Sequence, residues 1–282
     1  MSVNILDLSW EDIERLDKDK TVLFLRFAPI EAHGRHLPTG VDIFETAHWV
    51  ENSIEKLEKR FKAHTFISLP MVPLGHAVFK GFPGNIHLSQ KLFYCLVRSI
   101  LKAVAEWGIK HIVVISGHAD PKHAIAIEQA CDVLNKKHGD IAFAPMGAIF
   151  SEKVSSEVRQ QEKLDTQLKT YPKDYHVGWI ETSCMLDIDS EKVRDYKVQP
   201  DIVVSDREMI SPKKISAKAK GFGHLGYPRL AQKELGQLLN EDMAETISHC
   251  VAHFIERKDY RLYMHHELYK IPFLRVNKWG AL

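Results

Sequence analysis

The chain has 282 residues, of which 45% are hydrophobic and 27% are charged, so it has a globular composition and can bury a sizeable core. Its formal net charge is only +1, which gives no basic field for nucleic acid, and we expect no nucleic-acid partner. No apolar run approaches the roughly 18 residues that span a bilayer, so no membrane partner is expected either.

The expected strands and helices alternate along the first half of the chain. Apolar, β-branched runs predict strands at 21–28, 65–69, 111–116 and 141–146. Amphipathic spacing predicts helices at 4–18, 43–61, 90–107 and from 121 to about 137. The alternation indicates an α/β fold, in which a mostly parallel central sheet is flanked by helices on both faces.

The second half of the chain gives weaker signals. We expect a helix and a surface loop over 151–174, a helix led by 174–183, a loop with short strands over 190–222, and a long helix within 227–257. No repeat or linker divides the chain. Residues 1–282 are therefore predicted to form a single domain, with 258–282 as a C-terminal extension.

The cysteines and the N-terminus indicate a cytoplasmic protein. The four cysteines lie far apart without a CxxC pair, which favours free thiols over disulfides or a zinc ribbon. Residues 1–11 lack the basic segment with which a signal peptide begins.

Histidines and carboxylates follow two of the expected strands directly. Glu31, His33 and Asp42 come after the strand at 21–28, and His118 and Asp120 follow the strand at 111–116. Because the carboxyl ends of parallel strands meet along one edge of a sheet, we expect these two clusters to lie together. Imidazole nitrogens and carboxylate oxygens are ligands for divalent metals in hydrolases.

The same residues also have simpler structural interpretations than metal binding. A single H-x-H or E-x-H pattern occurs more often in a capped turn than in a metal site. Asp120 could cap the following helix, because Pro121 suits its first turn. His176 and Glu181 could be ordinary polar residues at the start of a helix. Two clusters, each straight after an apolar strand, favour the metal.

At this point the chain resembles the creatininase (creatinine amidohydrolase) superfamily of metal-dependent hydrolases. The resemblance rests on four ordered motifs: E-x-H-G-x-H-L-P at 31–38 with Asp42, G-H and F-P-G at 75–76 and 82–84, G-H-x-D at 117–120, and H-x-x-x-x-E-T-S at 176–183. A weaker match covers 226–236. The chain departs from the family pattern at Asn85, Ser116 and Asp120, where Thr, Asn and Glu are usual.

The resemblance implies a two-metal site. One ion would be held by Glu31, Asp42 and His118. The second would be held by His33, Asp42 and Asp120, with Asp42 as the bridge. We expect two divalent ions per chain, Zn, Mn or Fe, and the shorter side chain of Asp120 leaves the position of the second ion open.

The remaining roles also follow from the resemblance. His176 would be the proton shuttle, and Glu181 would orient it or bind the metal, so the expected catalytic residues are His176, Glu181 and Asp120. We expect substrate contacts from His76, Ala119 and Trp179, while His36 would hold the turn. The four carboxylates at 31, 42, 120 and 181 sum to about −4, which two divalent ions would balance.

The implied reaction is hydrolysis of a small molecule. A metal-activated hydroxide would attack a carbonyl of a small cyclic amide or formamide-type substrate and break a C–N bond. Creatinine itself is disfavoured, because residues 121–178 lack the tryptophans that close over the ring in members that open it.

Two other functions remain alternatives. The chain could open the ring of a cyclic diketone such as an oxidised inositol by C–C cleavage, or it could be a catalytically inactive metal-binding protein. The resemblance also predicts a homo-oligomer, a hexamer in many members.

Overall fold

The computed structural model describes residues 2–78, 81–151, 162–205, 208 and 211–276. Its centre is a sheet of five parallel strands in the order β1-β3-β2-β4-β5. The strands are β1 (Ser2–Asn4), β2 (Thr21–Arg26), β3 (Thr65–Ser68), β4 (His111–Ile115) and β5 (Ala142–Phe143). The predicted α/β class and parallel sheet are therefore confirmed.

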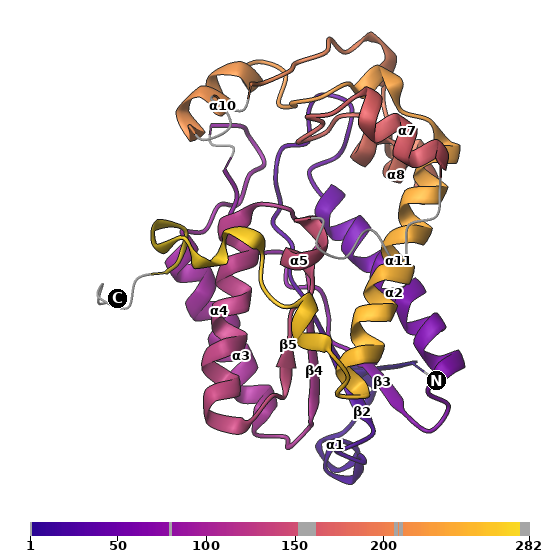
Figure 1. Cartoon of the computed structure of the whole chain (residues 1–282), viewed down its shortest axis with the longest axis vertical. Coiled ribbons are helices and arrows are strands. Elements are labelled where there is room, and N and C mark those ends of the chain that lie inside the picture. The colour runs from indigo at the N-terminus through magenta and orange to yellow at the C-terminus, as the bar shows by residue number, and fades with distance from the viewer. Residues whose placement is uncertain (1, 79–80, 152–161, 206–207, 209–210, 277–282) are drawn as a thin grey trace.

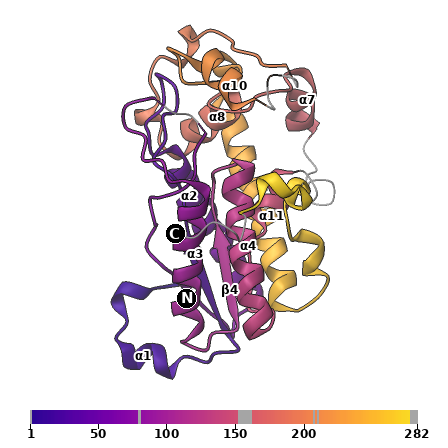
Figure 2. The same ribbon diagram turned by 90° about the vertical axis from the view of Figure 1, so that its left-hand side faces the viewer.

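Helices cover both faces of the sheet because both faces of its strands are apolar (Figures 1 and 2). Successive side chains of a strand point to opposite faces. Val22 and Phe24 pack in one hydrophobic cluster with residues of α2 (Val41–Arg60) and α11 (Lys233–Ile255). Leu23 and Leu25 pack in another with α3 (Gln90–Ala105) and α4 (Pro121–His138).

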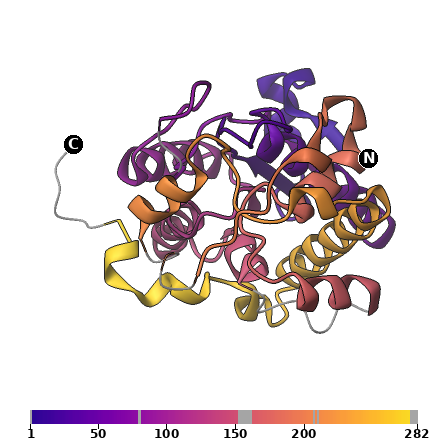
Figure 3. The ribbon, with the colours of Figure 1, turned by 90° about the horizontal axis from the view of Figure 1, so that it is seen from above.

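A cap of helices and loops covers the carboxyl edge of the sheet, at the top of Figure 1 and facing the viewer in Figure 3. It contains α7 (Glu162–Thr170), α8 (Trp179–Ile188) and α10 (Pro212–Ala219). The short α5 (Met146–Phe150) follows β5.

After α11 the chain returns toward α4 through short 3₁₀ turns at Tyr260–Tyr263, Glu267–Lys270 and Pro272–Leu274 (Figures 1 and 2). None of the helices in the described ranges is both long and apolar enough to cross a membrane. Cys95, Cys131, Cys184 and Cys250 are free thiols, as expected.

Several predicted boundaries were wrong for local reasons. Within 4–18 the α-helix α1 covers only Trp10–Arg15, with Ser9 as its N-cap, and the three residues of β1 were too few to give a pattern. The strand expected at 141–146 ends at Phe143, because Pro145 cannot donate to a ladder.

The segment 190–222 also differs from its prediction. Its described part contains α10 and 3₁₀ turns, with an isolated bridge between Ile202 and Gly226 instead of strands. Part of the predicted 151–174 segment, at 152–161, and the end of the extension, at 277–282, lie outside the described residues.

The cap is fixed to the sheet layer where α8 crosses α11. A Cβ atom at Gly236 would lie 1.8 Å from the carbonyl oxygen of Ser183, so only glycine allows this approach. The hydroxyl of Ser183 also accepts a hydrogen bond from the amide of Gln232 at 3.0 Å. The weak sequence match at 226–236 thus includes a close helix contact.

We expect Gly236→Ala to destabilise the protein although alanine is the better helix former by about 1 kcal/mol. Overpacking against Ser183 costs about 1–3 kcal/mol, which outweighs that gain. Denaturant unfolding measures the difference. The matched control is Gln237→Ala at the adjacent exposed position, which should be neutral or mildly stabilising. Equal stability of both variants would contradict the close contact.

Candidate metal centre

Two neighbouring strands bring the sequence clusters together. β2 and β4 pair in register, with Leu25 opposite Val114 and Arg26 opposite Ile115. The pairing extends one residue beyond β2, where Phe27 N donates to Ile115 O at 3.1 Å. The segments that follow these strands therefore leave the sheet side by side, as the topology predicted.

The first group of donors is Glu31, Asp42 and His118, all buried. His118 Nδ1 lies 3.5 Å from Glu31 Oε2 and 3.1 Å from Asp42 Oδ2. The three ligand atoms lie within 4.8 Å of one another, close enough for one ion to contact them all. This is the set expected for the first metal.

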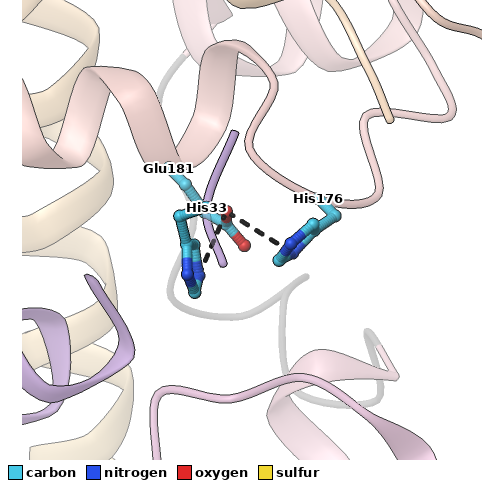
Figure 4. A group of neighbouring side chains, drawn as sticks. All are labelled: His33, His176 and Glu181. Carbon is cyan, nitrogen blue, oxygen red and sulfur yellow. Dashed lines mark ion pairs between the residues drawn. The ribbon is translucent and has the colours of Figure 1, made fainter. Parts of the chain in front are cut away.

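The second group of donors is His33, His176 and Glu181 (Figure 4). Glu181 Oε2 lies 3.9 Å from His33 Nε2 and 4.0 Å from His176 Nδ1. His33 Nδ1 lies 2.9 Å from the carbonyl oxygen of Glu31, to which it donates, and this bond turns Nε2 toward the other donors.

Asp42 lies between the two groups. Its Oδ1 is 3.3 Å from His33 Nε2, while its Oδ2 faces His118. Each carboxylate oxygen thus faces a different group, as a bridging carboxylate requires. Asp42 is the second residue of α2, so the N-terminal end of the helix dipole favours its negative charge.

A threonine ties the two sequence clusters to each other. Thr46 Oγ1 donates to the carbonyl oxygen of Asp42 at 2.6 Å and accepts from the amide of Gly117, also at 2.6 Å. A Cβ at Gly117 would lie 2.9 Å from that hydroxyl oxygen, so the approach requires glycine. Asp42 and His118 are therefore held by one hydroxyl group, which sequence patterns did not single out.

The turn at 33–37 is held from the cap. His36 Nε2 lies 3.0 Å from Thr182 Oγ1, and Gly34 N donates to Gly223 O at 2.9 Å. Gly34 has a φ of +67°, which glycine adopts without strain. This places His36 in the turn, where the sequence analysis expected it.

Asp174 organises the start of α8. Its carboxylate accepts hydrogen bonds from the amides of Trp179, Ile180 and Tyr227. A Cβ at Gly178 would lie 1.7 Å from Asp174 Oδ1, so the glycine makes room for the carboxylate. These contacts fix the loop that carries the second group of donors.

Hydrogen bonds to the backbone orient the side chains of His176 and Glu181 at this loop. Val177 has a φ of +56°, a strained conformation for a β-branched residue, and its amide donates to Glu181 Oε2 at 2.7 Å. His176 Nε2 donates to the carbonyl oxygen of Ala32 at 3.0 Å. Its Nδ1 is consequently the nitrogen that faces Glu181.

Burial and neighbouring charge shift the pKa values of the first-motif residues strongly. Burial alone would lower the pKa of His33 and of His118, but nearby carboxylates, Asp42 first, raise both values to about 10. Burial alone would raise the pKa of Asp42, but His118 and His33 hold it far below its usual range. The imidazoles of His33 and His118 are therefore both protonated at neutral pH in the metal-free chain.

The pKa values of His176 and Glu181, which come from the cap, shift in the opposite directions. Burial, and next the charge of His33, lower the pKa of His176 well below 6.5, so its imidazole is neutral at pH 7. Burial raises the pKa of Glu181 to about 7. A neutral imidazole and a carboxyl that titrates near pH 7 suit proton transfer.

Glu45 is a site residue that the sequence analysis missed. It lies on α2, one turn after Asp42, and is almost completely buried. Burial, and next the charges of Glu181 and Asp42, raise its pKa well above the usual value. Its spacing from Asp42, three residues along a helix, was the available signal.

Asp120 lies outside both groups of donors, unlike the expected second ligand set. Its Oδ1 accepts a hydrogen bond from the amide of His123 at 2.9 Å, so it caps α4 as the alternative interpretation held. Its charge still acts on His118, whose pKa it helps to raise. His176 occupies the place in the second group that Asp120 was expected to take.

The three expected substrate residues differ in their surroundings. Ala119 is exposed next to His118, and His76 is half-buried with its Nδ1 3.0 Å from Leu88 O. Trp179, in contrast, is fully buried in a hydrophobic cluster with Leu164 and Leu235. The position of its side chain supports packing, and substrate contact by Trp179 stays a prediction.

The residues present fit divalent metals. His33 Nε2 is buried and close to Asp42 and Glu181, yet it forms no hydrogen bond with either. Asp42 Oδ2 and His118 Nδ1 likewise face each other with Glu31 beside them. Each of these imidazole nitrogens thus lies near two carboxylates at once, which is the arrangement of ligands around a shared cation.

The family of the chain follows from its sequence. The sequence model of the creatininase family, described as creatinine amidohydrolase, matches residues 6–251. The chain therefore belongs to the creatininase family, and this membership supports a metal-dependent hydrolase. No curated protein sequence gives a significant match.

Solved structures share the fold at low sequence identity. A Glu-to-Gln variant of creatininase of Zn–Zn type is 19% identical with a TM-score of 0.69, covering 90% of this chain and 99% of the other. A manganese form of creatininase is 20% identical with a TM-score of 0.68, again covering 90% and 99%. A putative creatinine amidohydrolase from Bacteroides fragilis is 17% identical with a TM-score of 0.66, covering 92% and 98%.

Metal binding at pH 7 should release protons. The pKa values of about 10 mean that His33 and His118 are both charged in the metal-free chain, whereas a metal binds only the neutral imidazole. We expect up to two protons from the imidazoles, a further fraction of a proton from Glu181, whose pKa is about 7, and an apparent affinity that rises with pH from 7 to 10. Calorimetric titration in buffers of different ionisation enthalpy counts these protons. A buffer-independent heat at pH 7 would contradict the raised pKa values.

Proposed function

We propose that this chain is a metal-dependent hydrolase that cleaves a C–N bond in a small cyclic amide or formamide-type substrate. The supporting observation is the placement of six donor side chains in two groups, with Asp42 at the junction of the two. Glu31, Asp42 and His118 would hold one ion, and His33 with Glu181 would hold the other, with Asp42 between them.

Divalent ions in this centre would supply hydroxide at neutral pH and polarise a carbonyl oxygen. The chain's own residues fix where both effects act. Thr46 holds Asp42 and His118 in register, and Asp174 and Gly178 hold the loop that carries His176. This support keeps the donors in place before a substrate arrives.

His176 is placed to move a proton. Its Nε2–H is occupied by the carbonyl oxygen of Ala32, so Nδ1 carries the lone pair and faces Glu181. A neutral imidazole of this kind takes a proton as water is deprotonated and gives it to the departing nitrogen. Amine leaving groups need such a proton, which is why we favour C–N cleavage.

Glu181 and Glu45 set the charge around His176. In the metal-free chain burial raises the pKa of Glu181 to about 7 and raises the pKa of Glu45 well above its usual value.

Creatinine is disfavoured as the substrate. Residues 121–178 contain no tryptophan, and the first tryptophan after them, Trp179, is fully buried in a hydrophobic cluster. That segment therefore offers no indole to close over a flat ring. A different cyclic amide or a formamide suits the centre better.

The test is a screen of lactams, formamides and cyclic diketones with enzyme loaded with Mn, Zn or Fe. We expect turnover of a lactam or formamide, while turnover of a diketone alone would replace the proposal by C–C cleavage. Asp42→Asn and His118→Ala should lose bound metal and activity together, and His138→Ala, at an exposed histidine, should keep both. Substoichiometric metal in the wild-type chain would favour an inactive metal-binding protein.

His176→Ala separates proton transfer from metal binding. We expect the metal content to stay unchanged and kcat to fall by about 10²–10⁴, the usual effect of removing a general acid or base. Metal analysis and steady-state kinetics on the same preparation measure both. Loss of one ion per chain would instead make His176 a metal ligand.

A further inference from the structure

The C-terminal extension is attached to the helix that begins next to the metal centre. The family match ends at residue 251, and the residues beyond α11 dock on α4. Val276 N donates to Gln129 Oε1 at 2.7 Å, and His265 Nε2 lies 3.0 Å from Asp132 Oδ1. His266 N donates to Glu128 Oε1 at 2.7 Å.

Glu128 is more deeply buried than Gln129 and Asp132, the other two anchors on α4. Its side chain is almost completely buried, although a lone carboxylate is costly to bury. A Cβ at Gly147 would lie 1.9 Å from Glu128 Oε1, so α5 leaves space for this carboxylate in particular. The backbone of the extension then fixes its orientation through His266.

Glu128 lies on a small cavity behind the first group of donors. The cavity has room for about one water molecule, and Ser116, His118, His123 and Gly147 also line it. His118 Nδ1 faces Glu31 and Asp42 on the metal side. His118 Nε2 is buried and has no hydrogen-bond partner among the residues that the structure describes.

The other polar groups around the cavity have defined roles. His123 Nδ1 accepts from the amide of His76 at 3.2 Å, so its Nε2–H donates to Ser116 Oγ at 2.9 Å. Ser116 Oγ also accepts from the amide of His118 at 3.3 Å. Its own proton is therefore left to donate. A water in the cavity can accept from His118 Nε2–H and Ser116 and donate to Glu128.

We propose that Glu128 is a positioning residue for the metal ligand His118, joined to it by a water molecule in this cavity. The inference rests on the proposed metal centre. A ligating histidine almost always donates its second N–H to a carboxylate, a carbonyl or a water, which fixes the ring and strengthens the ligand. The extension thereby helps to orient a metal ligand, because the amide of His266 holds Glu128 and Glu128 in turn positions His118.

The test compares two substitutions on the same helix. Glu128→Gln keeps the size of the side chain but replaces one acceptor oxygen by a donor. Asp132→Asn is the matched control, because Asp132 lies one turn further along α4 and binds the same extension through His265 and Tyr269. Chelator competition gives the dissociation constant for Mn²⁺, and thermal unfolding of both metal-free variants reports how firmly the extension is attached.

We expect Glu128→Gln to weaken Mn²⁺ binding about 10–100-fold, the usual effect of losing a partner of a ligating histidine, while Asp132→Asn leaves it unchanged. Equal metal affinity in both variants, with equal loss of thermal stability, would show that the extension only packs, and would overturn the inference. Failure of the wild-type chain to bind any of Mn²⁺, Zn²⁺ and Fe²⁺ would instead overturn the proposed function.

A crystal structure of the metal-loaded chain provides a second measurement. It should show a water within hydrogen-bond distance of His118 Nε2 and the carboxylate of Glu128. An empty cavity, or a water that contacts only one of the two, would overturn the inference even if Glu128→Gln failed to fold.

Discussion

Carboxylates buried beside imidazoles are the constraint on which the rest of this molecule depends. Glu31 and Asp42 are almost inaccessible to water, and a buried carboxylate is stable only when positive charge or hydrogen-bond donors compensate it. In the metal-free chain the protonated imidazoles of His33 and His118 provide that charge. The parallel sheet makes the arrangement possible, because β2 and β4 deliver both clusters to one edge.

The sequence was sufficient for the features that depend on periodicity and topology. Apolar runs located β2 and β4, and the rule that parallel strands share a carboxyl edge placed Asp42 near His118. The motif around His176 and Glu181 joined the centre as expected, although it lies far along the chain. Predictions of this kind stay correct when the boundary of an element is wrong by a few residues, because they depend on whole elements and not on the direction of single side chains.

Features that depend on side-chain direction were harder to predict. Asp120 and His118 are two residues apart, yet one caps α4 while the other faces Asp42. Trp179 was expected to contact a substrate, and the turn around Asp174 places its side chain in a core cluster that the sequence did not indicate. Thr46 has no distinctive pattern at all. Its role arises only when Gly117 from another segment comes within 2.6 Å.

Val177 carries a consequence for any attempt to stabilise this protein. Its positive φ places a β-branched residue where glycine would be comfortable, at a cost of order 1–3 kcal/mol. The strained backbone aims the amide at Glu181 and keeps His176 against Ala32. Its side chain is fully buried against Leu37, Val41 and Met185, so glycine here would relieve the strain but lose this packing. The packing of the side chain therefore helps to hold the strained loop that orients the centre.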